Sequence, residues 1–238
     1  MLYKSTGKLL FLSFFSFFMS TSHAYIPTLI LAPEGDFASS GRNHTVAATT
    51  ECLRFAKELK QILTKNGTLN VIIAAKNKSK TTSYQTVSLA NRLKADLFLS
   101  LSMTAQDEVK PSVSLYYRSL NPLTELTTQR QRQPSLIPIT EAHTHCMLGT
   151  KKKASQLYEL LNVENNRKFI QTNKPLGLPL KQLTGLIVPG VFAEIGLGSH
   201  AAWKPLVKPF AESLIQLLQP SNHVHILQEL SEEKTSDA

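Results

Sequence analysis

The residue best placed for chemistry is Glu194, which lies between Ala193 and Ile195 in the mainly apolar stretch 186–200. A carboxylate inside an apolar strand usually has a polar partner or a catalytic role, because burying it unpaired costs roughly several kcal/mol. The alternative is a glutamate at the end of a strand that points into water. The local pattern leaves both interpretations open.

Other catalytic schemes have less support in the sequence. Ser102 has no Gly-x-Ser-x-Gly nucleophile elbow around it. Cys146 is adjacent to His145, but adjacent residues on a helix point in different directions. No two histidines have the i, i+4 spacing that places two metal ligands on one helix face, and there is no glycine-rich phosphate loop.

The segments that would position Glu194 alternate between strands and helices. Apolar and β-branched runs predict strands at 25–32, 69–75, 95–102, 113–118 and 186–195. Helical spacing of apolar residues predicts helices at 46–65, 84–94, 140–161 and 201–218. We expect a surface excursion at 119–138 and a connecting region with two prolines at 167–185. This order predicts an α/β fold with a twisted, mainly parallel sheet flanked by helices, and a site at the carboxyl ends of the strands.

The first 24 residues predict a secretory signal peptide. Lys4 and Lys8 precede the apolar run 9–19, and small residues follow at the cleavage positions. The run is about half of the ~20 residues that a membrane-spanning helix needs, so we expect cleavage and no membrane span afterwards. The remaining chain is expected to form one domain at 25–220 and a C-terminal tail at 221–238, in the periplasm or secreted.

Charge and cysteine content restrict the partners. The net charge of +9 becomes +7 when the two lysines of the signal peptide are removed. Export argues against nucleic acid as a partner, and a basic chain favours an anionic surface outside the cytoplasm, such as a cell wall. Cys52 and Cys146 would lie where disulfides persist, but they form no Cys-x-x-Cys motif and the sequence leaves their pairing open.

The order of the segments resembles the zinc-dependent N-acetylmuramoyl-L-alanine amidase family, the bacterial peptidoglycan amidases, over nearly the whole mature chain. The firmest matches are 89–91 with 95–101, then 188–197, and Leu115-Tyr116-Tyr117 fits a further strand. The resemblance implies zinc held by a His after the first strand, a Glu early in the first helix and a His ending the third strand. It also implies that a Glu on the last strand is the general base for a zinc-bound water, and Glu194 matches that position.

The sequence departs from this family at the metal ligands. Gly35 stands at the first His position and Ser102 at the second. The expected ligand glutamate falls near Ala48, with Glu51 one helical turn away as a shifted equivalent. Because glycine and a hydroxyl cannot replace two imidazoles, the family pattern predicts no metal site, and no cofactor is expected.

The leading hypothesis is therefore an exported cell-wall protein of this family, with lost or strongly reduced amide hydrolysis, in effect a pseudoenzyme. Its retained cleft would contain Glu194 at the base position together with Glu34, Asp36 and Ser102. The expected partner is peptidoglycan or an envelope protein, and the oligomeric state is open.

Two alternatives remain. In the first, the protein is an active peptidoglycan amidase with zinc in a rearranged site, to which His44, Glu51 or Asp36 contributes. In the second, it is a secreted interaction or effector module without enzymatic activity that uses the excursion at 119–138 and the basic surface.

Overall fold

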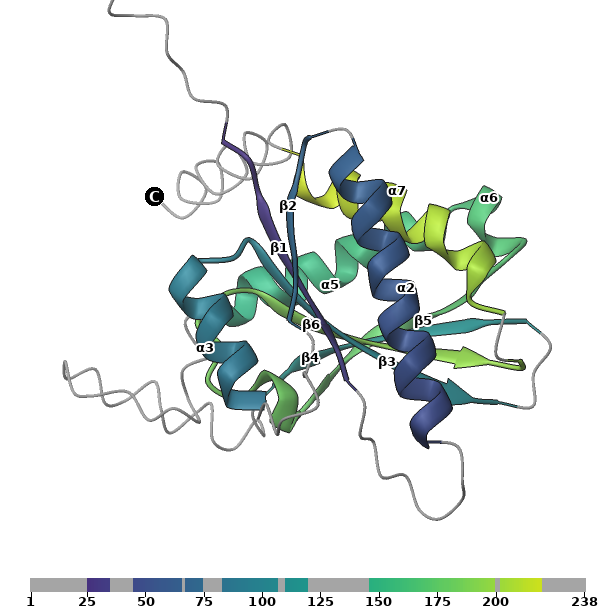
Figure 1. Cartoon of the computed structure of the whole chain (residues 1–238), viewed down its shortest axis with the longest axis horizontal. Coiled ribbons are helices and arrows are strands. Elements are labelled where there is room, and N and C mark those ends of the chain that lie inside the picture. The colour runs from purple at the N-terminus through teal and green to yellow at the C-terminus, as the bar shows by residue number, and fades with distance from the viewer. Residues whose placement is uncertain are drawn as a thin grey trace, which may run out of the picture.

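A computed structural model describes residues 25–34, 45–65, 67–74, 83–106, 110–119, 146–199 and 202–219 (Figure 1). The predicted signal peptide, almost all of the excursion at 119–138 and the tail at 221–238 lie outside these residues. Within the described part of the chain, no helix combines the length and the apolar character needed to cross a bilayer.

Strands and helices follow the predicted alternation. The strands are β1 (Thr28–Pro33), β2 (Asn70–Ile73), β3 (Leu97–Ala105), β4 (Ser112–Arg118), β5 (Gln171–Leu178) and β6 (Gly190–Leu197). The α-helices are α2 (Thr45–Lys65), α3 (Ser83–Leu93), α5 (Met147–Leu161), α6 (Glu164–Arg167) and α7 (Val207–Leu218), with 3-10 turns η2 (Lys181–Leu183) and η3 (Lys204–Leu206).

The strands form one six-stranded sheet in the order β2-β1-β3-β6-β4-β5. Strands β2, β1, β3 and β6 run parallel to one another, whereas β4 pairs antiparallel with β6 and parallel with β5. The prediction of a mainly parallel α/β sheet is confirmed.

Each central strand is buried on both faces, and alternate residues separate the two cores. Leu29 and Leu31 of β1 face the larger core, which α2, α5 and α7 cover. Ile30 of β1 and Phe192 of β6 face the smaller core, to which α3 and the η2 region contribute. We call these the large-core face and the α3 face. Figure 1 shows α2 and α3 as separate helices beside the central strands.

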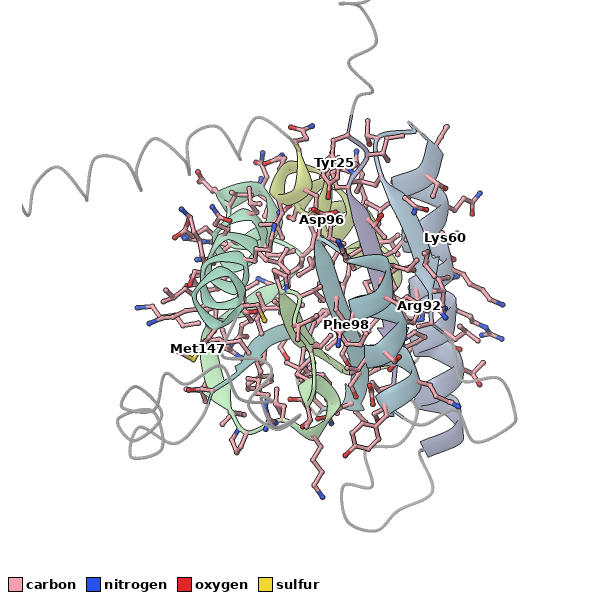
Figure 2. The ribbon with its side chains drawn as sticks, turned by 90° about the vertical axis from the view of Figure 1, so that its left-hand side faces the viewer. Tyr25, Lys60, Arg92, Asp96, Phe98 and Met147 are labelled. Carbon is pink, nitrogen blue, oxygen red and sulfur yellow. The ribbon has the colours of Figure 1, made fainter. Side chains whose placement is uncertain are left out.

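The beginning of β1 is tied to the loop before β3. The Asp96 carboxylate accepts hydrogen bonds from the Tyr25 hydroxyl at 2.5 Å and from the Thr28 backbone N–H at 2.7 Å. Figure 2 shows Tyr25 and Asp96 together at one end of the molecule. Burial, followed by the hydrogen bond to Asp96 and its charge, raises the pKa of Tyr25 to about 12.

The main correction to the predicted elements is β5, which lies in the region expected to be only a connection. The sequence does not predict β5 as a strand because it contains Pro175. A proline cannot donate to a sheet ladder, so it argues against a central strand. Here β5 is an edge strand, and the register shifts between Ser114 and Tyr116 of β4, opposite the segment containing Pro175. Pro175 is tolerated because it lies at an edge and at an irregularity in the pairing.

The last strand is also shifted, since it begins at Gly190 rather than at residue 186. The side chain of Asn91 on α3 holds the preceding loop by donating to the Gly185 carbonyl at 2.8 Å and accepting from the Ile187 N–H at 3.0 Å. These bonds satisfy loop groups that would otherwise need a strand partner. Strand β3 is longer than predicted and continues past Ser102 to Ala105.

Candidate functional site

Glu194 lies in a row of polar residues that crosses the sheet. It is opposite Ser102 of β3 on one side and opposite Ser114 of β4 on the other. Directly paired residues point to the same face, so these hydroxyls flank the carboxylate on the α3 face. On β5, Asn173 extends the row by donating its side-chain amide to the Ser114 hydroxyl at 2.8 Å.

The Glu194 carboxylate accepts a hydrogen bond from Tyr116 of β4, with 3.2 Å between the phenol oxygen and Oε2. The Tyr116 ring lies against the ring of Phe192, with centroids 5.9 Å apart. Burial is the main cause that raises the pKa of Tyr116, and the Glu194 charge and hydrogen bond add to it while the Ser114 hydroxyl opposes it. The phenol therefore stays protonated and acts as a donor to the carboxylate.

Among the described residues, the observed donor to Glu194 is the Tyr116 phenol rather than Ser102 or a backbone N–H. A partial signal for Tyr116 and Ser114 is present in the sequence, because they alternate with the apolar residues Val113 and Leu115 of the same strand. Alternation places them on one face, but it does not identify the strand beside them.

Beyond Glu194 the same face stays polar. Ser112 donates its hydroxyl to the Gln106 side-chain oxygen at 2.7 Å, and the Gln106 amide donates to the Lys110 carbonyl at 2.8 Å. Gly196 makes this possible, because a β-carbon there would lie 2.0 Å from the Gln106 oxygen. The absence of a side chain at Gly196 lets Gln106 lie across β6.

The loop after β1 begins beside this row. The Glu34 backbone N–H donates to the Leu101 carbonyl at 2.8 Å, so Glu34 lies level with Ser102. The same carbonyl accepts the Cys52 thiol at 3.2 Å, and burial raises the pKa of Cys52 to about 12. Gly35 at the first family His position, Asp36 of the predicted cleft and the weak metal candidate His44 lie outside the described residues.

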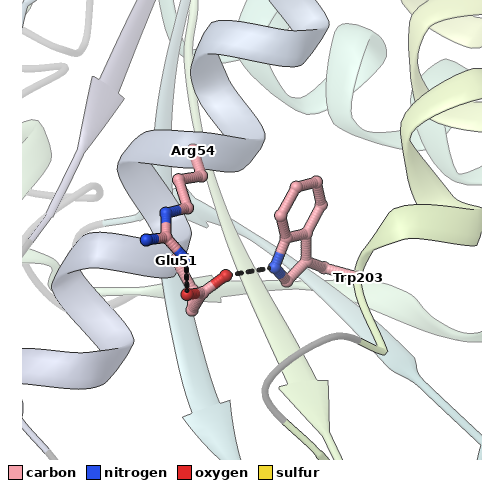
Figure 3. A network of polar contacts seen from close by, with 3 residues as sticks. All are labelled: Glu51, Arg54 and Trp203. Atoms are coloured by element: carbon pink, nitrogen blue, oxygen red, sulfur yellow. Dashed lines mark hydrogen bonds and ion pairs between the residues drawn. The ribbon is translucent and has the colours of Figure 1, made fainter.

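Glu51, the other weak metal candidate, binds protein groups with both carboxylate oxygens (Figure 3). Oε2 accepts the indole N–H of the buried Trp203 at 2.6 Å, and Oε1 accepts Arg54 Nη1 at 2.6 Å. Trp203 also packs edge-on against Phe55, with centroids 6.0 Å apart. Glu51 thus connects α2 to the segment that follows β6.

Cys52 and Cys146 are not joined by a disulfide in this structure. Cys52 is buried against β3, whereas Cys146 lies just before α5 and donates to the Val188 carbonyl at 3.2 Å. Burial also raises the pKa of Cys146 above that of an ordinary thiol.

The described residues do not fit the zinc site that the family resemblance implies. The groups beside Glu194 are the hydroxyls of Ser102, Ser114 and Tyr116, and neutral hydroxyls are poor substitutes for imidazole. No three His, Cys, Asp or Glu side chains in the described ranges are grouped to hold a metal ion. All seven histidines of the chain fall outside those ranges.

Comparison with solved structures identifies peptidoglycan amidase folds. The chain is similar to an N-acetylmuramoyl-L-alanine amidase from Clostridium difficile 630, with a TM-score of 0.52, 14% identity, and coverage of 81% of this chain and 95% of that one. The apo form of Ami1 from Mycobacterium abscessus gives a TM-score of 0.52 at 10% identity, and the match covers 81% of this chain and 99% of the Ami1 chain. The CwlD amidase from Clostridioides difficile, in complex with the GerS lipoprotein, gives a TM-score of 0.51 at 12% identity. That match covers 81% of this chain and 98% of the CwlD chain.

No protein-family model and no curated protein matches the sequence. At such low identities the structural likeness establishes the fold, an α/β sheet like that of amidase catalytic domains.

Proposed function

We propose that this chain is an exported, cell-wall-binding member of the N-acetylmuramoyl-L-alanine amidase family whose amide hydrolysis is lost or strongly reduced. The observation that carries the proposal is the pairing of Glu194 with Ser102 across β6 and β3. The glutamate occupies the family's base position, while a serine occupies a ligand position beside it.

The residues present support binding better than catalysis. Glu194 can accept a proton, but general-base help contributes only about 10²- to 10⁴-fold to a rate. Enzymes typically accelerate reactions by roughly 10⁶-fold or more, and the hydroxyls of Ser102 and Ser114 supply no strong electrophile for an amide carbonyl.

The polar row is suited to holding a polar polymer. Carboxylate, hydroxyl and amide groups on neighbouring strands offer both donors and acceptors, as binding sites with few, well-placed polar groups do. We place the ligand in peptidoglycan, with an envelope protein as the other candidate, and the protein in the periplasm or outside the cell.

Three measurements on purified residues 25–238 test this proposal: co-sedimentation with peptidoglycan sacculi, zinc content by elemental analysis, and mass spectrometry of released peptides. We expect the protein to pellet with sacculi, to contain far less than one zinc per chain and to release no amidase products. Glu58→Gln, an exposed position on α2, should behave like the parent protein.

Stoichiometric zinc together with amide cleavage that Glu194→Gln abolishes would overturn the proposed loss of activity and favour the rearranged metal site. Failure to pellet with sacculi, with specific capture of a protein from envelope extract, would favour a non-enzymatic interaction module.

A further inference from the structure

Glu194 carries a partly buried carboxylate that has no cationic partner among the residues the structure describes. Its hydrogen-bond donor is the neutral Tyr116 phenol, and no ion pair to it occurs among the described residues. The guanidinium of Arg118, at the end of β4, donates to the Leu180 carbonyl and the Thr184 hydroxyl, at 2.7 and 2.8 Å. An anion that is partly removed from water gains from a cationic ligand more than a fully exposed one does.

Among the described residues, the polar groups that directly flank this carboxylate can accept a hydrogen bond, and Ser114 already accepts one from the Asn173 amide. Ser102 and Ser114 stand opposite it on the two neighbouring strands. Each hydroxyl oxygen has two lone pairs, and Tyr116 gives its proton to Glu194 and so keeps its own oxygen as an acceptor. An ammonium group has three donors and no acceptor, which matches this set.

We propose that Glu194, Ser102, Ser114 and Tyr116 form a binding site for a primary ammonium group. The proposal rests on the proposed function in that the ligand carrying this group is sought in the cell wall. The ammonium proposal adds the chemical group of that ligand which the site recognises.

The geometry favours an ammonium over the other cations. A guanidinium binds a carboxylate best through two parallel hydrogen bonds, but Tyr116 already occupies Oε2 of Glu194. A calcium ion takes about six to eight oxygen ligands and usually several carboxylates, whereas this row supplies one carboxylate. An ammonium needs a single charged oxygen and neighbouring hydroxyls.

The first test compares two probes that differ only in the ammonium group, Nα-acetyl-lysine amide and Nα,Nε-diacetyl-lysine amide, by NMR titration of residues 25–238. We expect the first probe to bind and the diacetylated probe to bind at least about tenfold more weakly, since a charge-assisted hydrogen bond is lost. Equal binding of both probes, or binding of neither, would overturn the proposal.

Variants identify the site. Glu194→Gln should weaken binding of the lysine probe about tenfold, and Tyr116→Phe, which keeps the carboxylate but removes one acceptor, should weaken it only about threefold. Glu58→Gln removes the same charge from the exposed surface of α2 and should leave affinity unchanged. If Glu194→Gln does not fold, as judged by circular dichroism, Ser102→Ala replaces it, with an expected loss of about threefold. Unchanged affinity in the folded variant would place the ammonium elsewhere and overturn the proposal.

Sacculi separate this proposal from the proposed function. Native and N-acetylated sacculi are compared by co-sedimentation, and we expect acetylation to reduce pelleting. Equal pelleting of both, undiminished in Glu194→Gln, would overturn the ammonium site while leaving cell-wall binding intact. Binding of the lysine probe without pelleting of either kind of sacculus would support the ammonium site and contradict the proposed function.

Discussion

Replacing Glu51 with alanine is expected to destabilise the fold by removing the acceptor for the indole N–H of Trp203. The two residues are 152 positions apart in sequence and join α2 to the segment after β6. Trp203 is only 2% exposed, so water cannot readily replace the lost carboxylate. The variant therefore leaves a buried donor without a partner.

The magnitude follows from the two hydrogen bonds of the carboxylate. Loss of a charged acceptor by a buried donor costs about 1.5–3 kcal/mol. The Arg54 side chain is 62% exposed, and such surface ion pairs contribute only ~0–1 kcal/mol. Together these give a loss of about 1.5–4 kcal/mol, a large share of the roughly 5–15 kcal/mol that stabilises a typical domain. Glu51→Gln keeps an oxygen acceptor and should cost about 1 kcal/mol.

The assay uses the fact that the chain has a single tryptophan. Urea unfolding followed by Trp203 fluorescence reports this contact directly, and far-UV circular dichroism reports the whole fold. Coincident transitions justify a two-state free energy. For a chain of this size, the alanine variant should melt roughly 3–16 °C below the parent. Glu58→Ala, exposed on the same helix, is the control and should stay close to the parent.

Two results would refute this reasoning. One is an alanine variant whose unfolding free energy lies within about 0.5 kcal/mol of the parent, the range of ordinary surface substitutions. The other is a parent protein whose melting temperature falls in a chelator and recovers with zinc, while Glu51→Ala shows no such response. The second result would make Glu51 a metal ligand, the role that the sequence left open for it.

Three further predictions concern other contacts. Asn91→Ala should lower the unfolding free energy by about 1–3 kcal/mol, measured in urea, because two backbone groups of the loop before β6 lose their partner. Without reductant, the protein in denaturant should show two reactive thiols. In the folded state, Cys52 should resist Ellman's reagent and Cys146 should react slowly, because burial raises the pKa of both thiols. Tyr25 should ionise with a pKa of about 12 in an ultraviolet titration, and Asp96→Asn should lower that pKa.

The direction of the Tyr25 pKa shift determines how this residue changes the stability of the fold with pH. The pKa is raised from 10.0 in the folded chain, so folding holds the phenol proton more tightly. This contribution to stability is present below pH 10 and is lost as the pH rises towards 12. An unshifted Tyr25 titration would contradict the hydrogen bond to Asp96.

Controls for the other two predictions are available in the chain. Ser88→Ala, exposed on the same helix as Asn91, should be neutral or slightly stabilising, since alanine is the better helix former. If Asn91→Ala is equally neutral, the loop before β6 does not depend on its side chain. A thiol count of zero in denaturant would show that Cys52 and Cys146 form a disulfide.

Local patterns in the sequence were sufficient for most of the secondary structure. Helix α2 was predicted within one residue of its observed bounds, because its apolar residues recur with helical spacing and Gly67 follows at positive φ. Strand β5 was missed because Pro175 and a polar composition are typical of loops, and only an edge position with an irregular register makes that segment a strand.

The sequence by itself determined that Glu194 lies in a mainly apolar strand, because this depends only on residue type and local order. That Ser102 and Gly35 stand at metal-ligand positions stays a prediction from the family resemblance. Only the tertiary structure decided which groups meet the carboxylate. Alternation along a strand assigns a side chain to a face, but its neighbours depend on which strands pair and in what register. The position of β4 beside β6 brings Tyr116 to Glu194, and no local pattern encodes that pairing.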